Sequence, residues 1–546
     1  MGSFGKNRCV CRHAERRKLM MKRRTRILLF WCILALAFFA RAYQYGAVPA
    51  DLNQDEAFAG YNAYTLLHGG RDSFGYSFPM YLTAWGSGMN ALESYLAIPL
   101  FALFGASTRV LRLVPLLLSM LTITAVYRMI REHMHSDSFA LLTMFLTGVM
   151  PWHIMLSRWA LESNLAPAFL TFGLYFFLKG MENQKYYILS ALFYGLSLYS
   201  YATIWMVVPF VILAQVVYAA IKKKITLSGY TVSAGILLVS LGFPILLFIM
   251  VNKGLIDEIR TPVFSVPRLL WFRGGEVSFS AISDNLKNLF LMLSAQSDGL
   301  PWNYTEKYGL FYLFSTPFII IGLIVLMLPW LFGKKAAVDE EGKKENGFRF
   351  FLLVQILAGL AVGALIHVNV NRVNLLMLPL IVLISYGWFA LIHQREWRGI
   401  RLEFIPVLIY LIAFLMFESH YFTEYREEIG RYFCRGLEPC MTFAQEQEAD
   451  RVYISPNASY ARILFLTKQD LDEYLETVVY KNYPSAFLDV YSFGKYNFAV
   501  SWSDKPDGHS LYVLDASYDQ SDLVRELMAA GCNMYLSSDW RVYYFP

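Results

Sequence analysis

The sequence predicts an α-helical polytopic membrane protein with about eleven transmembrane helices, followed by a small α/β domain outside the membrane. Composition is the first reason. Of the 546 residues, 56% are hydrophobic and only 16% are charged, whereas average soluble proteins are about 25% charged. An ordinary soluble enzyme and a disordered chain are both excluded, because apolar content this high must be buried in protein or in lipid.

Charge distribution is the second reason. The segment from Ser419 to Pro546 carries 11 Lys and Arg against 19 Asp and Glu, a net charge of −8. Because the whole chain has a net charge of +6, the part before Ser419 has a net charge of +14. In that preceding part the basic residues stand between long apolar runs, as at the cytoplasmic borders of membrane helices. They form no folded basic face, so we expect no nucleic-acid partner.

The N-terminal segment is the first element. Residues 1–26 hold ten basic groups and one acid, Glu15, and an apolar run at residues 27–45 follows. A secretory signal peptide is the alternative interpretation, but no small-residue cleavage site follows Ala40-Arg41. We expect a cytoplasmic basic tail, residues 1–26, and a retained first span.

The apolar run from Asn90 to Phe104 decides the topology. As a helix it reaches roughly 22 Å, against a hydrocarbon core of about 30 Å, and it contains Glu93 and Pro99. If it crossed the membrane, the later basic loops would face outward, against the positive-inside rule. We therefore expect an interfacial or re-entrant helix.

This assignment fixes a transmembrane domain at residues 27–418 with two large outer loops, residues 46–108 and 252–307. Five inner loops then carry basic residues, among them the triplet Lys222, Lys223 and Lys224. The expected spans are residues 27–45, 109–130, 138–156, 165–181, 186–203, 205–221, 230–251, 308–332, 350–367, 373–392 and 404–418.

Residues 419–546 are expected to form an extracytoplasmic α/β domain. The sequence predicts strands at Arg451–Ser455 and Ser510–Asp515, and a helix at Asp519–Ala530 capped by Ser517 or Ser521. A hairpin is expected from 533–536 and 541–545. A disulfide between Cys434 and Cys440 is one alternative for the cysteines here.

Three carboxylates, Asp51, Asp55 and Glu56, stand just beyond the first span. One interpretation is a helix cap, because acids are common in the first turn of a helix. The loop that follows is long, aromatic and rich in glycine, as suits a segment lying on a membrane surface. A carboxylate at that boundary is suited to act as a general base toward an acceptor hydroxyl.

Several motifs together resemble the glycosyltransferase family 39 group, which includes protein O-mannosyltransferases and bacterial aminoarabinose–lipid A transferases. The resemblance covers most of the membrane part, to about Ile392. The motifs are Asp55-Glu56, residues 103–108 followed by Arg109-Val110-Leu111-Arg112-Leu113-Val114-Pro115, residues 157–164, and Asn371-Arg372 before Leu378-Pro379-Leu380.

The resemblance implies a GT-C fold and an enzyme that moves a sugar from a polyprenyl-phosphate donor to a hydroxyl acceptor on the outer face. The acceptor would be a protein, a lipid or a cell-envelope glycan. Asp55 would be the catalytic base and Glu56 its partner, Glu162 an acid of the second outer loop, and Arg372 a contact to the lipid phosphate. One feature departs from the aminoarabinose branch, since Phe78 stands before Pro79 in place of lysine.

Arginines on the outer side are further candidates for the lipid phosphate, because a guanidinium binds an oxyanion with two hydrogen bonds. The alternatives are that these side chains reach to lipid headgroups, and that Arg158 pairs with Glu162 one turn away. Aromatic residues of the second loop, Trp271, Trp302 and Tyr304, suit either sugar rings or an interfacial belt. The arginines are Arg112, Arg158, Arg260, Arg268, Arg273 and Arg372.

Two other functions remain as alternatives. A transporter or flippase of a lipid-linked saccharide would place charged groups near the bilayer midplane, whereas here they gather at one face. A membrane-anchored assembly protein would use the acidic C-terminal domain. No cofactor is expected, since no His or Cys set has metal-ligand spacing, although some relatives with this fold use a divalent metal. The expected partners are the lipid-linked donor, the acceptor and membrane lipid.

Overall fold

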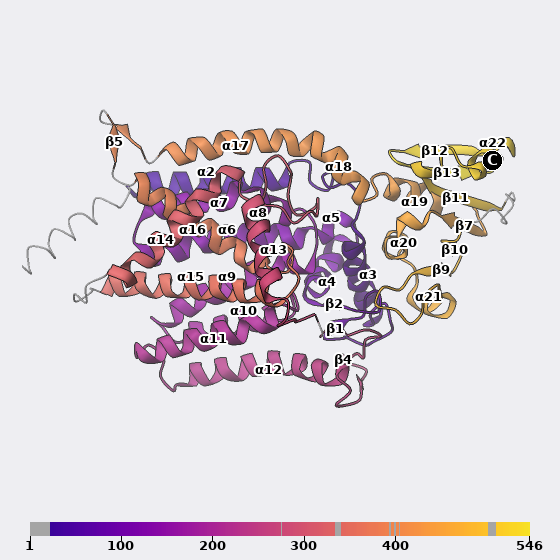
Figure 1. The fold of residues 1–546 in the computed structure, drawn as a ribbon. Coiled ribbons are helices and arrows are strands. Elements are labelled where there is room, and N and C mark those ends of the chain that lie inside the picture. The colour runs from indigo at the N-terminus through magenta and orange to yellow at the C-terminus, as the bar shows by residue number, and fades with distance from the viewer. Residues whose placement is uncertain are drawn as a thin grey trace, which may run out of the picture.

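The computed structural model describes residues 22–272, 274, 276–332, 340–392, 395–397, 400–402, 404–500 and 509–546. A bundle of long helices lies beside a smaller sheet domain at the C-terminus (Figure 1). Most of the basic tail, Arg273 and the lysines Lys334 and Lys335 of one expected inner loop fall outside the described residues.

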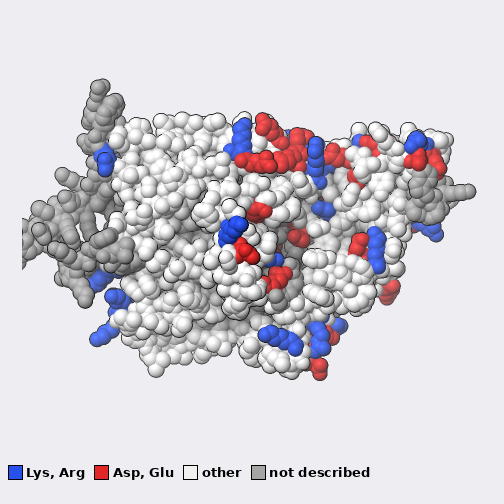
Figure 2. Space-filling model, in the orientation of Figure 1, with Lys and Arg blue, Asp and Glu red and all other residues white. Residues whose placement is uncertain are grey.

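The helices of the bundle differ in how much of their apolar surface is buried by other helices. Helices α7 (Asp137–Val149), α9 (Ala166–Gly180) and α16 (Met377–Ile392) are buried over almost their whole length, and they are hydrophobic on all sides. Outside them, α2 (Arg23–Ala42), α12 (Gly229–Asn252) and α17 (Phe404–Phe422) leave large apolar side chains exposed. On the face in Figure 2, a broad band over the bundle bears no charged residue. Such a surface suits lipid.

Seven of the described helices are long and apolar enough to cross a membrane. They are α2, residues 108–134 (with α6, Leu113–Met134), α11 (Ile204–Ile221), α12, residues 342–365 (within α15, Glu340–Leu365), residues 374–392 (with α16) and α17. The expected span at 138–156 is interrupted, because Pro151 lacks an amide hydrogen and starts α8 (Pro151–Leu156) after α7. Helices α9, α10 (Tyr186–Ser197) and α14 (Thr316–Phe332) are shorter than 18 residues. The count of eleven therefore stays a prediction.

The loops separate into two ends, as the topology predicts. The turn with the lysine triplet, the start of α15 and the hairpin of β5 (Glu396–Trp397) and β6 (Ile400–Arg401) lie at one end (Figure 1). The other end holds the sheet domain, β3 (Ile259–Arg260), β4 (Ser265–Val266) and the first loop. Which end faces the cytoplasm stays a prediction from charge.

The first loop contains α3 (Gln54–Gly69), the short pair β1 (Tyr81–Leu82) and β2 (Met89–Asn90), and α4 (Leu92–Phe104), ahead of α5 (Thr108–Leu111). Helix α4 has 13 residues, about 20 Å, shorter than the roughly 30 Å hydrocarbon core of a membrane. It packs on α3, where the Ser94 hydroxyl donates to the Ala59 carbonyl at 2.9 Å. Helix α13 (Ile282–Ala295) belongs to the second large loop.

The C-terminal domain has a sheet in the order β12-β13-β11-β7-β10-β9-β8. Strands β7 (Arg451–Ile454) and β11 (Ser510–Asp515) pair in parallel, and β12 (Asn533–Ser537) and β13 (Trp540–Tyr544) form the expected hairpin. The expected helix begins three residues late, as α22 (Asp522–Ala529) with Ser521 as its N-cap. The other elements are α18 (Glu424–Tyr432), α19 (Leu437–Gln445), α20 (Tyr460–Thr467), α21 (Leu471–Thr477), β8 (Val479–Tyr480), β9 (Val490–Phe493) and β10 (Tyr496–Asn497).

Candidate active site

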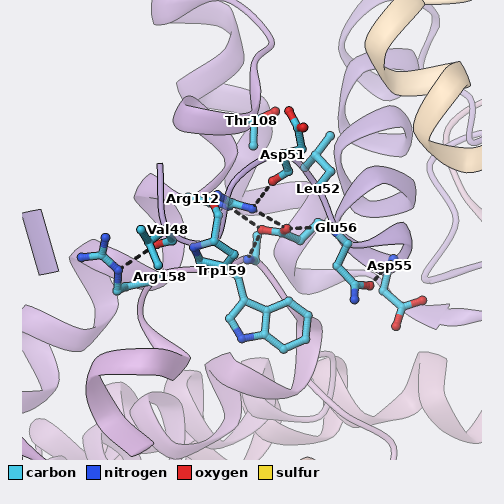
Figure 3. A network of polar contacts seen from close by, with 12 residues as sticks. Val48, Asp51, Leu52, Asp55, Glu56, Thr108, Arg112, Arg158 and Trp159 are labelled. Carbon is cyan, nitrogen blue, oxygen red and sulfur yellow. Dashed lines mark hydrogen bonds and ion pairs between the residues drawn. The ribbon is translucent and has the colours of Figure 1, made fainter. Parts of the chain in front are cut away.

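The first turn of α3 is held by a capping box. The Asn53 side chain accepts the Asp55 amide hydrogen at 2.9 Å, and the Glu56 carboxylate accepts the Asn53 amide hydrogen at 3.1 Å. The cap interpretation is therefore correct for Asn53 and Glu56. Asp55 is the remaining acid of this turn, and Figure 3 shows its carboxylate pointing away from the Glu56 side chain.

Glu56 forms a buried ion pair with Arg112. The Arg112 Nε and Nη2 atoms donate to the two carboxylate oxygens at 2.8 Å each, and both side chains have 0% exposure (Figure 3). Arg112 also donates to the Pro49 carbonyl at 2.7 Å, and Glu56 accepts the Ala160 amide hydrogen at 2.7 Å. The pair joins the first loop, the start of α6 and the loop after α8, and Arg112 reaches neither solvent nor lipid.

Arg158 is also buried, and it serves the end of α2. Its guanidinium donates to five backbone carbonyls at 2.9–3.1 Å. Two of these carbonyls, in the last turn of α2, have no partner within the helix, and the other three belong to the segment that follows it. The five acceptors are Ala40, Arg41, Tyr43, Gln44 and Val48.

Asp55 and Glu162 line one cavity of about 460 Å³ at the end of the bundle next to the C-terminal domain. The Trp85 indole donates to the Asp55 carboxylate at 3.4 Å, and Glu162 accepts the Asn90 amide hydrogen. Both carboxylates are partly exposed. Two acidic side chains, one from the first loop and one from the loop after α8, therefore line the same cavity.

The C-terminal domain forms the other wall of this cavity through Ser459, Tyr460, Phe487, Leu488 and Asp489. The Tyr460 and Ser459 hydroxyls are buried and have no hydrogen-bond partner among the described residues. Nothing in the sequence indicated these residues, because they reach the cavity only through packing of one domain on the other.

Backbone hydrogen bonds are among the contacts that attach the C-terminal domain to the first loop. The Leu488 amide donates to the Trp85 carbonyl at 2.6 Å, beside Gly86. Gly86 has a φ of +97°, and a Cβ there would lie 2.2 Å from the Ser485 carbonyl oxygen, so only glycine fits. On the far side of α3 the Asp51 carboxylate accepts the Leu437 amide hydrogen at 3.0 Å and that of Gly436.

Burial changes the acidity of two carboxyl groups here. Desolvation, reinforced by Glu438, raises the pKa of Asp51 from 3.8 to about 7 against its backbone donors. Glu93, buried on α4, has carboxylate oxygens without a hydrogen-bond partner among the described residues. Burial, with Glu56 and Glu162 nearby, raises the pKa of Glu93 well above its usual range.

The remaining arginine candidates lie outside this cavity. Arg372 forms an ion pair with Glu276 at 2.9 Å and donates to the His367 carbonyl at 3.1 Å, although its neighbour Asn371 lines the cavity. Arg268 donates to the Ile256 carbonyl at 3.0 Å on the surface. Arg260 pairs with Glu258 at 2.8 Å. None of the described residues that line the cavity is Lys or Arg.

The described part of the chain contains neither the expected disulfide alternative nor a cluster of metal-binding side chains. Cys434 and Cys440 are both free thiols. Within the described ranges no group of three or more His, Cys, Asp or Glu side chains is arranged to hold a metal ion.

The chain matches known proteins in sequence and in fold. Residues 92–248 match the family model described as dolichyl-phosphate-mannose-protein mannosyltransferase, a stretch that includes Glu162 but begins after Asp55. No curated protein matches the chain at a significant level. The resemblance to the mannosyltransferase family is thus confirmed for this stretch.

Solved structures extend the likeness to nearly the whole fold. ArnT from Cupriavidus metallidurans in the apo state has 11% identity and a TM-score of 0.52, with 95% of this chain and 97% of that chain covered. The oligosaccharyltransferase AglB from Archaeoglobus fulgidus, in complex with an inhibitory peptide and a dolichol-phosphate, has 12% identity and a TM-score of 0.45. That match covers 81% of this chain and 64% of the archaeal one. The chain has the fold of the GT-C membrane glycosyltransferases.

Proposed function

We propose that this protein is a membrane glycosyltransferase that moves a sugar from a polyprenyl-phosphate donor to a hydroxyl acceptor on the extracytoplasmic face. The observation that carries the proposal is the shared cavity of Asp55 and Glu162, next to the C-terminal domain at one end of a GT-C fold. The family match of residues 92–248 supports the donor class.

Asp55 is the general base of this reaction. Its carboxylate takes the proton of the acceptor hydroxyl, the hydroxyl oxygen bonds to the anomeric carbon, and the bond from that carbon to the phosphate oxygen breaks. Polyprenyl phosphate leaves with the electron pair. The Trp85 indole orients the base, and the capping box fixes the turn that carries it.

Glu162 and Arg372 act on the donor side. The Asn90 amide holds the Glu162 carboxylate at the cavity, where it accepts hydrogen bonds from sugar hydroxyls. Three carboxylates, those of Asp55, Glu162 and Asp489, line this space and repel a phosphate. The phosphate therefore binds at the edge beyond Asn371, where Arg372 exchanges its contact with Glu276 for the lipid oxyanion.

Glu56, Arg112 and Arg158 have a positioning role in this proposal. Their charged groups are buried and bound to protein partners, so they hold the turn that carries Asp55 and the end of α2.

Replacement of Asp55 by Asn tests the proposal. Membranes that contain the variant are supplied with radiolabelled polyprenyl-phosphate sugars, and transfer of the label is measured. Loss of a general base lowers the rate about 100- to 10,000-fold. Asp450→Asn is the matched control, since Asp450 is exposed and lies outside the cavity. Wild-type transfer by a normally expressed Asp55→Asn variant would overturn the assignment.

A further inference from the structure

A second cavity, of about 680 Å³, lies on the other side of the first turn of α3. Gln54 lines both cavities, with Asn53 on the side of the second and Asp55 on the side of the first. The two cavities are therefore neighbours at this helical turn, with Gln54 in the wall of both.

The walls of the second cavity combine aromatic faces with polar groups. Trp302 and Tyr432 meet edge to face with their ring centroids 6.1 Å apart, and Tyr432 is 49% exposed. Trp540 also lines the cavity, with only 2% of its surface exposed. Aromatic rings of this kind offer apolar surface with little conformational entropy to lose.

Two polar side chains in these walls suit hydroxyl groups. The Asn457 amide is held in place because it donates to Asp515 at 2.9 Å. The Asp539 carboxylate forms a long ion pair with Arg435 at 3.8 Å, and the same oxygen, Oδ2, is buried and accepts no hydrogen bond among the described residues. A buried acceptor without a donor is costly, and a ligand hydroxyl can supply the donor.

The cavity is preformed by Arg462. This buried guanidinium donates to the Leu52 carbonyl at 2.6 Å, to the Ala458 carbonyl at 3.1 Å and to the Tyr432 carbonyl at 3.2 Å. It thereby joins the segment before α3, the sheet domain and the end of α18. A site held in this way loses little freedom when it binds a ligand.

We propose that the second cavity is the acceptor subsite and that it binds a saccharide, so that the acceptor of the transfer is a glycan. This inference rests on the proposed function, because it needs Asp55 as the base. Aromatic faces take the C–H surface of a sugar ring, while Asn457 and Asp539 bond its hydroxyls. The volume lies within the roughly 300–1,000 Å³ of typical ligand sites. Two arginines, Arg431 and Arg462, and two aspartates, Asp515 and Asp539, line the cavity, so its walls carry no net charge that would favour an anion.

Binding of the purified full-length protein to an array of oligosaccharides of two to six sugars, with a parallel set of peptides, tests this inference. We expect saccharide binding that becomes about tenfold weaker in Tyr432→Ala and in Asn457→Ala. Tyr491→Ala is the matched control, because Tyr491 is a C-terminal tyrosine of similar exposure, 47%, that lines neither cavity.

The outcomes separate this inference from the proposed function. Absence of saccharide binding, preference for peptides, or binding that Tyr432→Ala leaves unchanged would overturn the acceptor subsite, even if Asp55→Asn abolishes transfer. Saccharide binding that depends on Tyr432, together with full transfer by Asp55→Asn, would leave the subsite standing and overturn only the role of the base.

Discussion

Glu56 and Arg112 are joined by two hydrogen bonds of 2.8 Å in an ion pair that is closed to solvent. One partner lies in the first turn of α3 and the other just before α6. The residue next to Glu56 is the proposed base, so this ion pair sets where the base stands.

Removal of one partner should cost more than removal of both. Arg112→Ala leaves a buried carboxylate without its cation, which costs about 3–5 kcal/mol. We expect Arg112→Ala to reduce yield and thermal stability in detergent more than the double change Glu56→Leu with Arg112→Met does. Equal losses in the single and double variants would show that the pair contributes little.

The raised pKa of Asp51 predicts a pH dependence of stability. Since the pKa is about 7 in the folded chain and 3.8 ordinarily, the folded state favours the protonated form. The stabilisation is complete below about pH 4, declines as the pH rises to about 7, and stays lost above that. Thermal unfolding between pH 5 and pH 8 should show a smaller decline in Asp51→Asn than in the wild type, and parallel curves would contradict this.

Gly86 should tolerate no side chain. Alanine there meets the Ser485 carbonyl at 2.2 Å and adopts a φ of +97°. We expect Gly86→Ala to loosen the C-terminal wall, seen as faster proteolysis of the segment after residue 419 and slower sugar transfer. Gly105→Ala is the control, because Gly105 has a φ of +81° but no atom near a new Cβ. This substitution therefore adds the backbone strain of about 1–3 kcal/mol without a steric clash.

Sidedness can be measured by labelling. In a cysteine-free background, Lys223→Cys and Asp450→Cys introduce single thiols at the two ends of the bundle. We expect a membrane-impermeant maleimide to label residue 450 in intact cells and residue 223 only after lysis. The reverse labelling pattern would show that the protein has the opposite orientation in the membrane, with the candidate active site on the cytoplasmic side.

Local signals predicted much of this fold. Short apolar runs predicted β7, β11 and the hairpin of β12 and β13, and the length of the run at Asn90 to Phe104, with its glutamate and proline, predicted the short helix α4. In the site, Asp55 and Glu162 were identified from motifs, and the structure brings them to one cavity.

Long-range packing accounts for what the sequence could not provide. Arg112 and Arg158 lie near the predicted outer ends of helices, where the sequence suggests exposed side chains. In the structure both are buried, because backbone carbonyls and the Glu56 carboxylate from distant segments bind them. Tyr460 and Asp489 reach the cavity only because the C-terminal domain docks on the first loop. Such contacts have no local pattern in the chain.

A structure determined with bound polyprenyl phosphate would locate the donor site. We expect the phosphate at the edge of the first cavity, within contact of Arg372, with the sugar side of the phosphate turned toward Asp55 and Glu162. A headgroup bound at the opposite end of the bundle, beside Lys222 to Lys224, or outside the cavity altogether, would contradict it.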